Sequence, residues 1–471
     1  MRPADSAGFK DGDGYHMRTR FSSASPMLAV VVALVMVASS ASAEWKEKVL
    51  YSFQGLPNDG SYPAGGVVFD HAGNLYGATT DGGANNCPGI AQCGTVFQLQ
   101  APAQKGGAWT ENLLYVFKGV NSNDGNTPVG GVIFDQAGNL YGTTAYGGTA
   151  NCMLFGSRVG CGTVYEMTPP KQKGGAWTET VLHSFQSGKD GYFPWGDLTF
   201  GSAGNLYGAT EYGGGYGSCN APYYQYCGTV FKLSPPKTKG GKWKEHVLYA
   251  FKSGKDGANP NGGLVFDGEG ALYGTTVYGG STNCKTDGGV GCGTAFELAP
   301  DKRGASWTEN QLHNFADYQK DGAGPNGGLA FDAKGGLYGT TSGGGGTENG
   351  VIFELAKSGG QWVETVLRTF LDGRDSMAGL IFDSLGNLYG TTSGGGFDGV
   401  GTVFKLKEPA VDREEKWGLS LLHTFTGPPD GDLPASRLVF DNAGDLYGST
   451  QNGGTGQGCR QGCGVLFELK P

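Results

Sequence analysis

A fifteen-residue motif that recurs seven times constrains the fold of this chain more than any other feature. Its clearest copy runs from Gly130 to Thr144, and its Leu-Tyr-Gly core returns along the whole sequence. The core tyrosines are Tyr76, Tyr141, Tyr207, Tyr273, Tyr338, Tyr389 and Tyr447, at steps of 65, 66, 66, 65, 51 and 58 residues. Self-similarity at such a period predicts a repeat architecture in which each copy forms one supersecondary unit.

Each repeat unit has the composition of four short strands separated by turns. In the first unit these are residues 45–53, which begin at a Trp, and then 66–70, 75–80 and 94–99. The units begin near residues 45, 109, 177, 243, 307, 362 and 417. Helical periodicity is absent after residue 43, and the units are too long for the coils of a β-solenoid. The sequence therefore predicts an all-β, seven-bladed β-propeller with four antiparallel strands per blade.

The order of strands within a blade also follows from composition. The Gly-rich, apolar second segment suits the crowded centre, whereas the Trp segment carries charges such as Lys244 and Glu245 and suits a solvated outer edge. The chain then begins with an outer strand. We expect residues 45–53 to complete the last blade beside residues 464–469, so that the N-terminal strand closes the ring.

The first 43 residues differ from everything that follows. Arg18 and Arg20 precede an apolar run over residues 27–37, and Ala41-Ser42-Ala43 matches an Ala-x-Ala cleavage site. This pattern predicts a signal peptide over residues 1–43 and a secreted or otherwise extracytoplasmic protein, with residues 44–471 as a single propeller domain. No second apolar span follows, so we expect a mature chain without a transmembrane segment, and a monomer.

Composition excludes some partners. The 89 glycines occur at fixed offsets beside aromatic residues, so we interpret them as turn residues between strands. Aromatic residues make up 12% of the chain, which is enough to form a packed core and argues against disorder. The formal net charge of −9 disfavours nucleic acid, because neutralising phosphates needs clustered Lys and Arg.

The ten cysteines form five local pairs, each flanking the loop between the third and fourth strands of a unit. The pairs are Cys87 with Cys93, Cys152 with Cys161, Cys219 with Cys227, Cys284 with Cys292, and Cys459 with Cys463. The fifth and sixth units lack both members, and paired loss predicts disulfides formed in an oxidising compartment. Zinc is the alternative, but no His or second Cys pair has ligand spacing. We expect no metal and no cofactor.

The repeated Gly-Asn-Leu-Tyr-Gly-Thr-Thr core, followed by Gly-Thr-Val-Phe-Glu-Leu, resembles the choice-of-anchor tandem repeat GloVer-containing proteins of bacteria. The resemblance covers essentially residues 44–471. It implies an exported, surface or extracellular repeat protein. The family brings no agreed catalytic residues, so the resemblance assigns none to this chain.

The third unit departs from the repeat by adding aromatic residues. Seven of the eight tryptophans occupy the repeat position, and Trp195 is the exception. The candidate binding residues of this unit are Tyr192, Phe193, Trp195, Tyr212, Tyr216, Tyr223, Tyr224 and Tyr226. Aromatic faces suit the stacking of sugar rings, whereas the alternative is a hydrophobic plug that packs the longer loop.

The Asp-Gly turns of the repeat place carboxylates, among them Asp124, Asp190 and Asp256, on the same rim as the cysteine loops. Such a ring of carboxylates could bind a cation or position a substrate, although Asp-Gly is equally a common turn. The histidines His183, His313 and His423 share a repeat position with tyrosines, so they are interpreted as surface residues of outer strands. No catalytic residue is assigned.

Three functions are compatible with these features, because a propeller hosts all of them. The first is a non-catalytic binding module for an extracellular polysaccharide or oligosaccharide. The second is a carbohydrate-active lyase or glycoside hydrolase that uses the rim carboxylates. The third is a structural surface scaffold.

Overall fold

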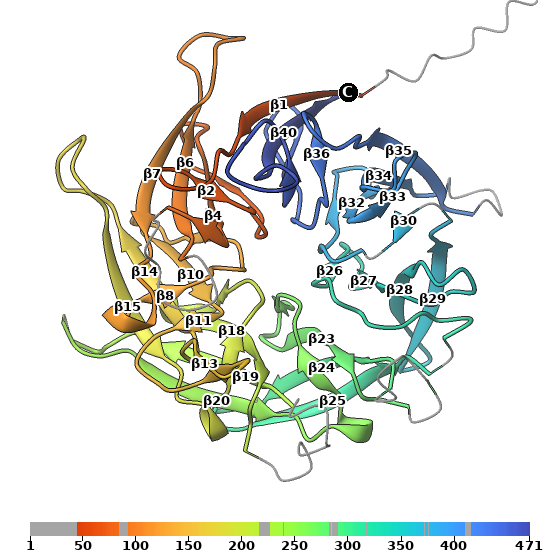
Figure 1. The fold of residues 1–471 in the computed structure, drawn as a ribbon. Coiled ribbons are helices and arrows are strands. Elements are labelled where there is room, and N and C mark those ends of the chain that lie inside the picture. Colours follow the sequence, from red (N-terminus) through yellow and green to blue (C-terminus); the bar gives the residue numbers. More distant parts are fainter. Residues whose placement is uncertain are drawn as a thin grey trace, which may run out of the picture. The chain divides into compact units, whose positions relative to one another are not determined.

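Seven antiparallel sheets follow one another along the chain, each with four strands that correspond to one blade (Figure 1). The computed structural model describes residues 45–83, 93–215, 227–238, 240–281, 284, 291–316, 318–371, 373–374, 376–409 and 416–471. No α-helix occurs in these residues. The prediction of an all-β, seven-bladed propeller is confirmed.

Within each blade, four strands follow one another from the innermost to the outermost. Blade 1 contains β3 (Val68–Phe69), β4 (Leu75–Thr79), β6 (Thr95–Gln100) and β7 (Thr110–Val116). Blade 2 contains β9 (Ile133–Phe134), β10 (Leu140–Thr144), β14 (Thr163–Thr168) and β15 (Thr178–Ser184). Blade 3 contains β17 (Thr199–Phe200), β18 (Leu206–Tyr212), β19 (Thr229–Ser234) and β20 (Lys244–Ala250). Blade 4 contains β22 (Val265–Phe266), β23 (Leu272–Tyr278), β24 (Thr294–Pro300) and β25 (Trp307–Asn314).

The last three blades follow the same order. Blade 5 contains β26 (Ala330–Phe331), β27 (Leu337–Thr340), β28 (Val351–Ser358) and β29 (Gln361–Thr369). Blade 6 contains β31 (Ile381–Phe382), β32 (Leu388–Thr392), β34 (Thr402–Lys407) and β35 (Gly418–Thr424). Blade 7 contains β37 (Val439–Phe440), β38 (Leu446–Thr450), β40 (Val465–Lys470) and β1 (Lys46–Ser52).

Short strands pair the Asp-Gly turn of a unit with the start of the loop between its third and fourth strands. They are β2 (Gly60–Ser61) with β5 (Asp81–Gly82), β8 (Gly125–Asn126) with β11 (Tyr146–Gly147), β30 (Gly373–Arg374) with β33 (Gly394–Gly395), and β36 (Gly431–Asp432) with β39 (Asn452–Gly453). In blades 3 and 4 the turn strands β16 (Tyr192–Pro194) and β21 (Ala258–Pro260) pair directly with β18 and β23. A hairpin of β12 (Met153–Leu154) and β13 (Ser157–Arg158) lies in the cysteine loop of the second unit. The described 3₁₀ turns are η1 (Val120–Ser122), η2 (Gly188–Asp190), η3 (Ser202–Gly204) and η5 (Gly254–Asp256).

The N-terminal strand closes the ring, as the sequence predicts. Strand β1 pairs antiparallel with β40, from Lys46 opposite Lys470 to Ser52 opposite Val465. Every blade therefore takes its outermost strand from the Trp segment that follows it in the repeat, and blade 7 takes it from the start of the domain.

The second strand of each blade lies at the centre of the hydrophobic core. All five residues of β4 are buried, and the glycine of its Leu-Tyr-Gly core is required by packing. A Cβ atom on Gly77 would lie 2.7 Å from Cζ of Phe97, which is fully buried on the neighbouring strand. The glycine leaves room for the end of the Phe97 ring beside the backbone of β4.

Neighbouring blades are joined by the same three aromatic side chains at every interface. The core Tyr of one blade contacts the innermost-strand Phe and the outer-strand Trp of the next, with centroid distances of 5.0 Å for Tyr76–Phe134 and 6.2 Å for Tyr76–Trp177. The other triplets are Tyr141–Phe200–Trp243, Tyr207–Phe266–Trp307, Tyr273–Phe331–Trp362, Tyr338–Phe382–Trp417, Tyr389–Phe440–Trp45 and Tyr447–Phe69–Trp109. We call these the aromatic triplets.

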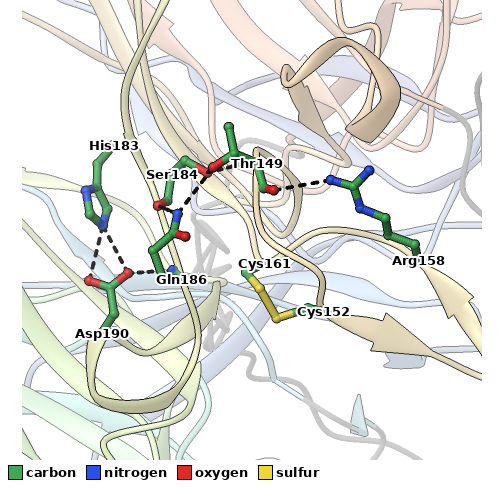
Figure 2. Close-up of a disulfide and its surroundings, with 8 residues drawn as sticks. All are labelled: Thr149, Cys152, Arg158, Cys161, His183, Ser184, Gln186 and Asp190. Atoms are coloured by element: carbon green, nitrogen blue, oxygen red, sulfur yellow. Dashed lines mark hydrogen bonds and ion pairs between the residues drawn. A yellow bond between two sulfur atoms is a disulfide. The ribbon is translucent and has the colours of Figure 1, made fainter.

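Disulfides close the cysteine loops. The bonds Cys152–Cys161 (Figure 2), Cys284–Cys292 and Cys459–Cys463 are those the sequence predicts. Cys93 and Cys227 are also disulfide-bonded, and their predicted partners Cys87 and Cys219 lie outside the described residues. The second cysteine also ties its blade to the next one, as where the Cys161 carbonyl accepts a hydrogen bond from the Phe193 N–H at 3.0 Å.

The closure of the ring can be tested at Phe53. This side chain is fully buried directly after β1 and lies 5.1 Å from the ring of Phe97 in blade 1. Phe53→Ala should lower the free energy of unfolding by about 3–5 kcal/mol, because it removes a core aromatic at the junction of blades 7 and 1. The matched control is Phe155→Ala, which alters a side chain that is 92% exposed and should shift stability by less than about 0.5 kcal/mol. Equal melting temperatures for the two variants would contradict this account of closure.

The remaining cysteine pairs can be tested by counting thiols. The denatured but unreduced protein should react with no thiol reagent, because all ten cysteines are expected in bonds within their own units. Peptide mapping that finds Cys93 or Cys227 bonded to a cysteine of another unit would show that the local pairing is wrong.

Candidate binding cavity on the propeller axis

The Gly-Gly segments that precede the innermost strands bring neighbouring backbones into contact around the axis. A Cβ on Gly65 would lie 2.4 Å from the backbone of Gly130, and one on Gly130 would lie 3.0 Å from the carbonyl oxygen of Gly196. Side chains are therefore excluded at these points, and the backbone itself forms the inner wall.

The second position of each segment forms what we call the axial ring. Its members, from blade 1 to blade 7, are Gly66, Gly131, Asp197, Gly263, Gly328, Gly379 and Arg437. Five are glycines, and contacts pass from one to the next, as where a Cβ on Gly131 would lie 2.9 Å from the oxygen of Gly66. Blades 3 and 7 replace this glycine with an acid and a base.

A cavity of about 540 Å³ opens against this ring and is lined by residues of all seven blades. Two positions before the axial ring, each blade contributes one residue to the cavity wall. This set, the mouth ring, consists of Ala64, Val129, Trp195, Asn261, Asn326, Met377 and Ala435. A second cavity of about 390 Å³ is also lined by Gly66, Gly131, Asp197 and Arg437, together with apolar residues of the innermost strands. The axial ring thus borders both cavities.

Trp195 is the largest side chain of the mouth ring, and it is 39% exposed. Its position is fixed by the backbone before it. Phe193 adopts a φ of 58° while donating to the Cys161 carbonyl, and Pro194 pairs with Thr210 of β18. Met377, on the blade 6 side of the mouth ring, is 44% exposed. The cavity therefore offers an aromatic face and a flexible thioether to a ligand.

Polar groups of the cavity converge from blades 3, 4, 5 and 7. Asn261 Nδ2 donates to Asn326 Oδ1 at 2.8 Å, whereas Oδ1 of Asn261 is buried without a hydrogen-bond partner among the described residues. Oδ1 of Asp197 accepts from the Gly131 N–H at 2.6 Å. Arg437 lines both cavities, its side chain is exposed, and it makes no ion pair within the described part of the chain.

The candidate aromatic residues of the third unit divide into two groups in the structure. Phe193 is 6% exposed and contacts Tyr192 and Tyr212 at centroid distances of 4.9 and 5.4 Å, within the core between blades 2 and 3. Trp195 is separate from this core and lines the axial cavity. The remaining candidates, Tyr216, Tyr223, Tyr224 and Tyr226, lie outside the described residues.

The carboxylates of the Asp-Gly turns bind their own turn and the preceding outer strand. Asp124, 5% exposed, accepts from the Lys118 N–H and the Tyr115 hydroxyl, both at 2.8 Å. The equivalent contacts of Asp190 are with the Gln186 N–H at 2.6 Å and His183 Nε2 at 3.3 Å (Figure 2), and those of Asp256 are with the Lys252 N–H and Tyr249. These three aspartates line neither cavity.

Each of these turns also faces a glutamate from the outer strand of the next blade. Six glutamates have a buried Oε1 without a hydrogen-bond partner in the described chain, namely Glu47, Glu111, Glu179, Glu245, Glu309 and Glu364. Burial raises the pKa of Glu111 from its ordinary 4.5 to about 8, and the Asp59 carboxylate adds to the rise. Burial likewise raises the pKa of the other five to about 7. These glutamates are therefore largely protonated just below neutral pH, each beside the carboxylate of a turn aspartate.

One of these clusters has the geometry of a metal site. Glu47, His423 and Asp430 each place a ligand atom within 4.8 Å of the others. The same cluster is built with a tyrosine in place of the histidine at Tyr51, Tyr115 and Tyr249, where the hydroxyl donates to the aspartate. The recurring arrangement thus needs only a hydrogen-bonding partner for the aspartate at this position.

Comparison with protein families places the chain in a class of bacterial repeat proteins. The family model of the Gloeobacter/Verrucomicrobia repeat matches residues 35–219, 150–370 and 216–459. The chain belongs to this family. It matches none of the curated proteins with which it was compared.

Several solved structures match this chain at low sequence identity and with TM-scores below 0.5. A proposed 6-phosphogluconolactonase from Bacteroides uniformis is 15% identical, with a TM-score of 0.47 over 84% of this chain and 99% of the other. A protein of unknown function from Dyadobacter fermentans is 12% identical, with a TM-score of 0.43 over 91% and 100%. A gluconolactonase from Xanthomonas campestris is 17% identical, with a TM-score of 0.35 over 62% and 74%. Identities this low carry no information about activity.

The axial residues could have been found in the sequence by aligning the seven repeat units with one another and comparing them position by position. The repeat period and the turn residues alone do not reveal them. Alignment of the seven units places Asp197 and Arg437 where five units have glycine, and it places Asn261, Asn326 and Met377 at the position of Trp195. A charged residue in a column of glycines marks a point where the packing rule is broken, and such points are often functional.

The buried glutamates make stability depend on pH. Below about pH 4.5 Glu111 is protonated in both the folded and unfolded states, and between 4.5 and 8 only the unfolded state ionises. Stability should therefore be greatest at the acidic end of this window and should fall as the pH rises to about 8. The melting temperature of Glu111→Gln should depend less on pH across that window than that of the wild type. Glu269→Gln, at an exposed hairpin turn, is the control, and an identical pH profile for Glu111→Gln and wild type would contradict the assignment.

Proposed function

We propose that the protein is a non-catalytic binding module that takes a saccharide into the axial cavity, with Trp195 as the stacking platform. The observation that carries this proposal is the position of Trp195, an exposed aromatic at the mouth of a cavity built by all seven blades. A volume of about 540 Å³ is in the usual range for small-molecule sites, which is about 300–1,000 Å³.

The chemistry of the cavity suits a sugar. One face of a pyranose ring carries C–H groups that pack on an indole, while its hydroxyls need hydrogen-bond donors and acceptors at the edges. Asn261 and Asn326 provide amides of both kinds, and the glycine backbones provide N–H and C=O groups. Oδ1 of Asn261 has no partner in the described chain and is buried, so we propose that a hydroxyl reaches it when the side chain turns toward the ligand.

The catalytic alternative has less support. It depends on the rim carboxylates, and Asp124, Asp190 and Asp256 already hold their turns against the outer strands. Using one of them in catalysis would release a turn from its strand. The scaffold alternative leaves the exposed tryptophan of the mouth ring without a role.

An extracytoplasmic location fits this function. The disulfides of three cysteine loops are compatible with an oxidising compartment. The signal peptide that the sequence predicts lies outside the described residues. Among the described residues, none forms a helix with the length and apolar character needed to span a bilayer.

Replacing Trp195 tests the proposal. With a panel of neutral and acidic oligosaccharides, Trp195→Ala should weaken binding by about 1–3 kcal/mol, the usual effect of losing an aromatic anchor. The melting temperature should change little, because this side chain stands outside the interblade core. The matched control is Phe155→Ala, an exposed aromatic that lines neither cavity and should leave affinity unchanged.

The same samples decide between binding and the alternatives. A loss of stability without a loss of affinity would end the proposal for Trp195. New reducing or unsaturated ends in the incubated oligosaccharides would show that the protein is an enzyme.

A further inference from the structure

We infer that the saccharide bound in the axial cavity carries a carboxylate and that Arg437 is the residue that binds it. This inference rests on the proposed function and specifies its ligand class as an acidic sugar, such as a uronate. It starts from the replacement of glycine by arginine at one of the seven positions of the axial ring.

The surroundings of Arg437 leave its side chain room to meet a ligand. Its neighbour in the ring is Gly66, where a Cβ would lie 3.2 Å from the Arg437 carbonyl oxygen and 3.4 Å from the Arg437 Cβ. Because Gly66 lacks that atom, no side chain competes for the space on this side. The adjacent residue, Ser436, is buried and bonded to the backbone at Ser449, so the backbone that carries Arg437 is fixed.

The charge of Arg437 is not neutralised by the described residues of the protein. The other charged member of the axial ring, Asp197, is separated from Arg437 by blades 1 and 2, and its Oδ1 is held by the Gly131 N–H at 2.6 Å. No ion pair joins the two residues within the described chain. A guanidinium stays charged at all relevant pH values and presents a fork of N–H donors that matches the two oxygens of a carboxylate.

The charges of the cavity disfavour a doubly charged phosphate more than a singly charged carboxylate. Arg437 is the single basic residue among the cavity-lining residues, which also include the acids Asp81 and Asp197. A phosphate carries up to two negative charges, and a cavity with one base and two acids repels the second. One carboxylate on a ring that stacks on Trp195 can be neutralised by the one guanidinium in the same cavity.

The experiment compares acidic sugars with their carboxyl-reduced counterparts. Oligogalacturonate, oligomannuronate and oligoguluronate are each titrated calorimetrically beside the neutral oligomer made by reducing every carboxylate to an alcohol. At least one acidic oligomer should bind about 10- to 100-fold more tightly than its neutral counterpart, as expected for hydrogen bonds to a charged group. Inorganic phosphate should compete with the bound uronate less well than acetate does.

Three variants assign the preference to Arg437. Arg437→Gln should remove the preference for the acid and leave the affinity for the reduced oligomer within about threefold, whereas Arg437→Lys should retain part of it because the charge remains without the fork. The control Arg303→Gln removes an exposed arginine outside the cavity and should preserve the preference. Melting temperatures confirm that each variant is folded.

The possible failures separate this inference from the proposed function. If a reduced oligomer binds as tightly as its acid, or if Arg437→Gln keeps the preference, the inference is wrong while saccharide binding stands. Stronger competition by phosphate than by acetate would overturn the choice of a carboxylate. If no saccharide binds, both the inference and the proposed function are wrong.

Discussion

The edge-to-face contact between aromatic rings of neighbouring blades is the interaction on which the rest of this structure depends. The core Tyr of each blade reaches the Phe and the Trp of the next, and the same geometry occurs at all seven interfaces, including Tyr389 with Trp45 across the closure. Equivalent interfaces set equivalent angles between blades, and this brings the Gly-Gly segments together at the axis. The close packing that the aromatic contacts impose on the blades explains the glycines at the axis, because a Cβ at Gly65 or Gly130 would be too close to the backbone of the next blade.

Most of the fold could be predicted from the sequence, because each motif specifies a local element and the period repeats it. The blade count, the strand order, the closure by β1 and the described disulfides need only the repeat and the alternation of turns and strands. The axial cavity needs more. Gly66 and Arg437 become neighbours only when the ring closes, so no local pattern joins them. Trp195 stands out in the sequence as an exception to the repeat, but its place in the axial cavity depends on the positive φ of Phe193 and the pairing of Pro194 with β18.

The contacts of the Asp-Gly turns show that a repeat position whose residue type varies can still have a structural role. A position that alternates between tyrosine and histidine has the pattern of an unconstrained surface, yet Tyr115 and His183 both contact the turn aspartate that follows them. The two side chains differ in size and charge but share one polar atom at a similar reach. The repeat units keep a hydrogen bond to the turn aspartate at this position, and both tyrosine and histidine can provide it.

The mouth ring is separate from the contacts that hold the blades together. Its seven residues sit on equivalent backbones, one per blade, and they are chemically unrelated, with alanine, valine, tryptophan, asparagine and methionine among them. The contacts that hold the blades together are made elsewhere by the aromatic triplets, so a substitution in the mouth ring leaves those contacts intact. The architecture is therefore a frame in which the side chains around one cavity can differ from blade to blade, with Asn261 and Asn326 as a hydrogen-bonded pair among them.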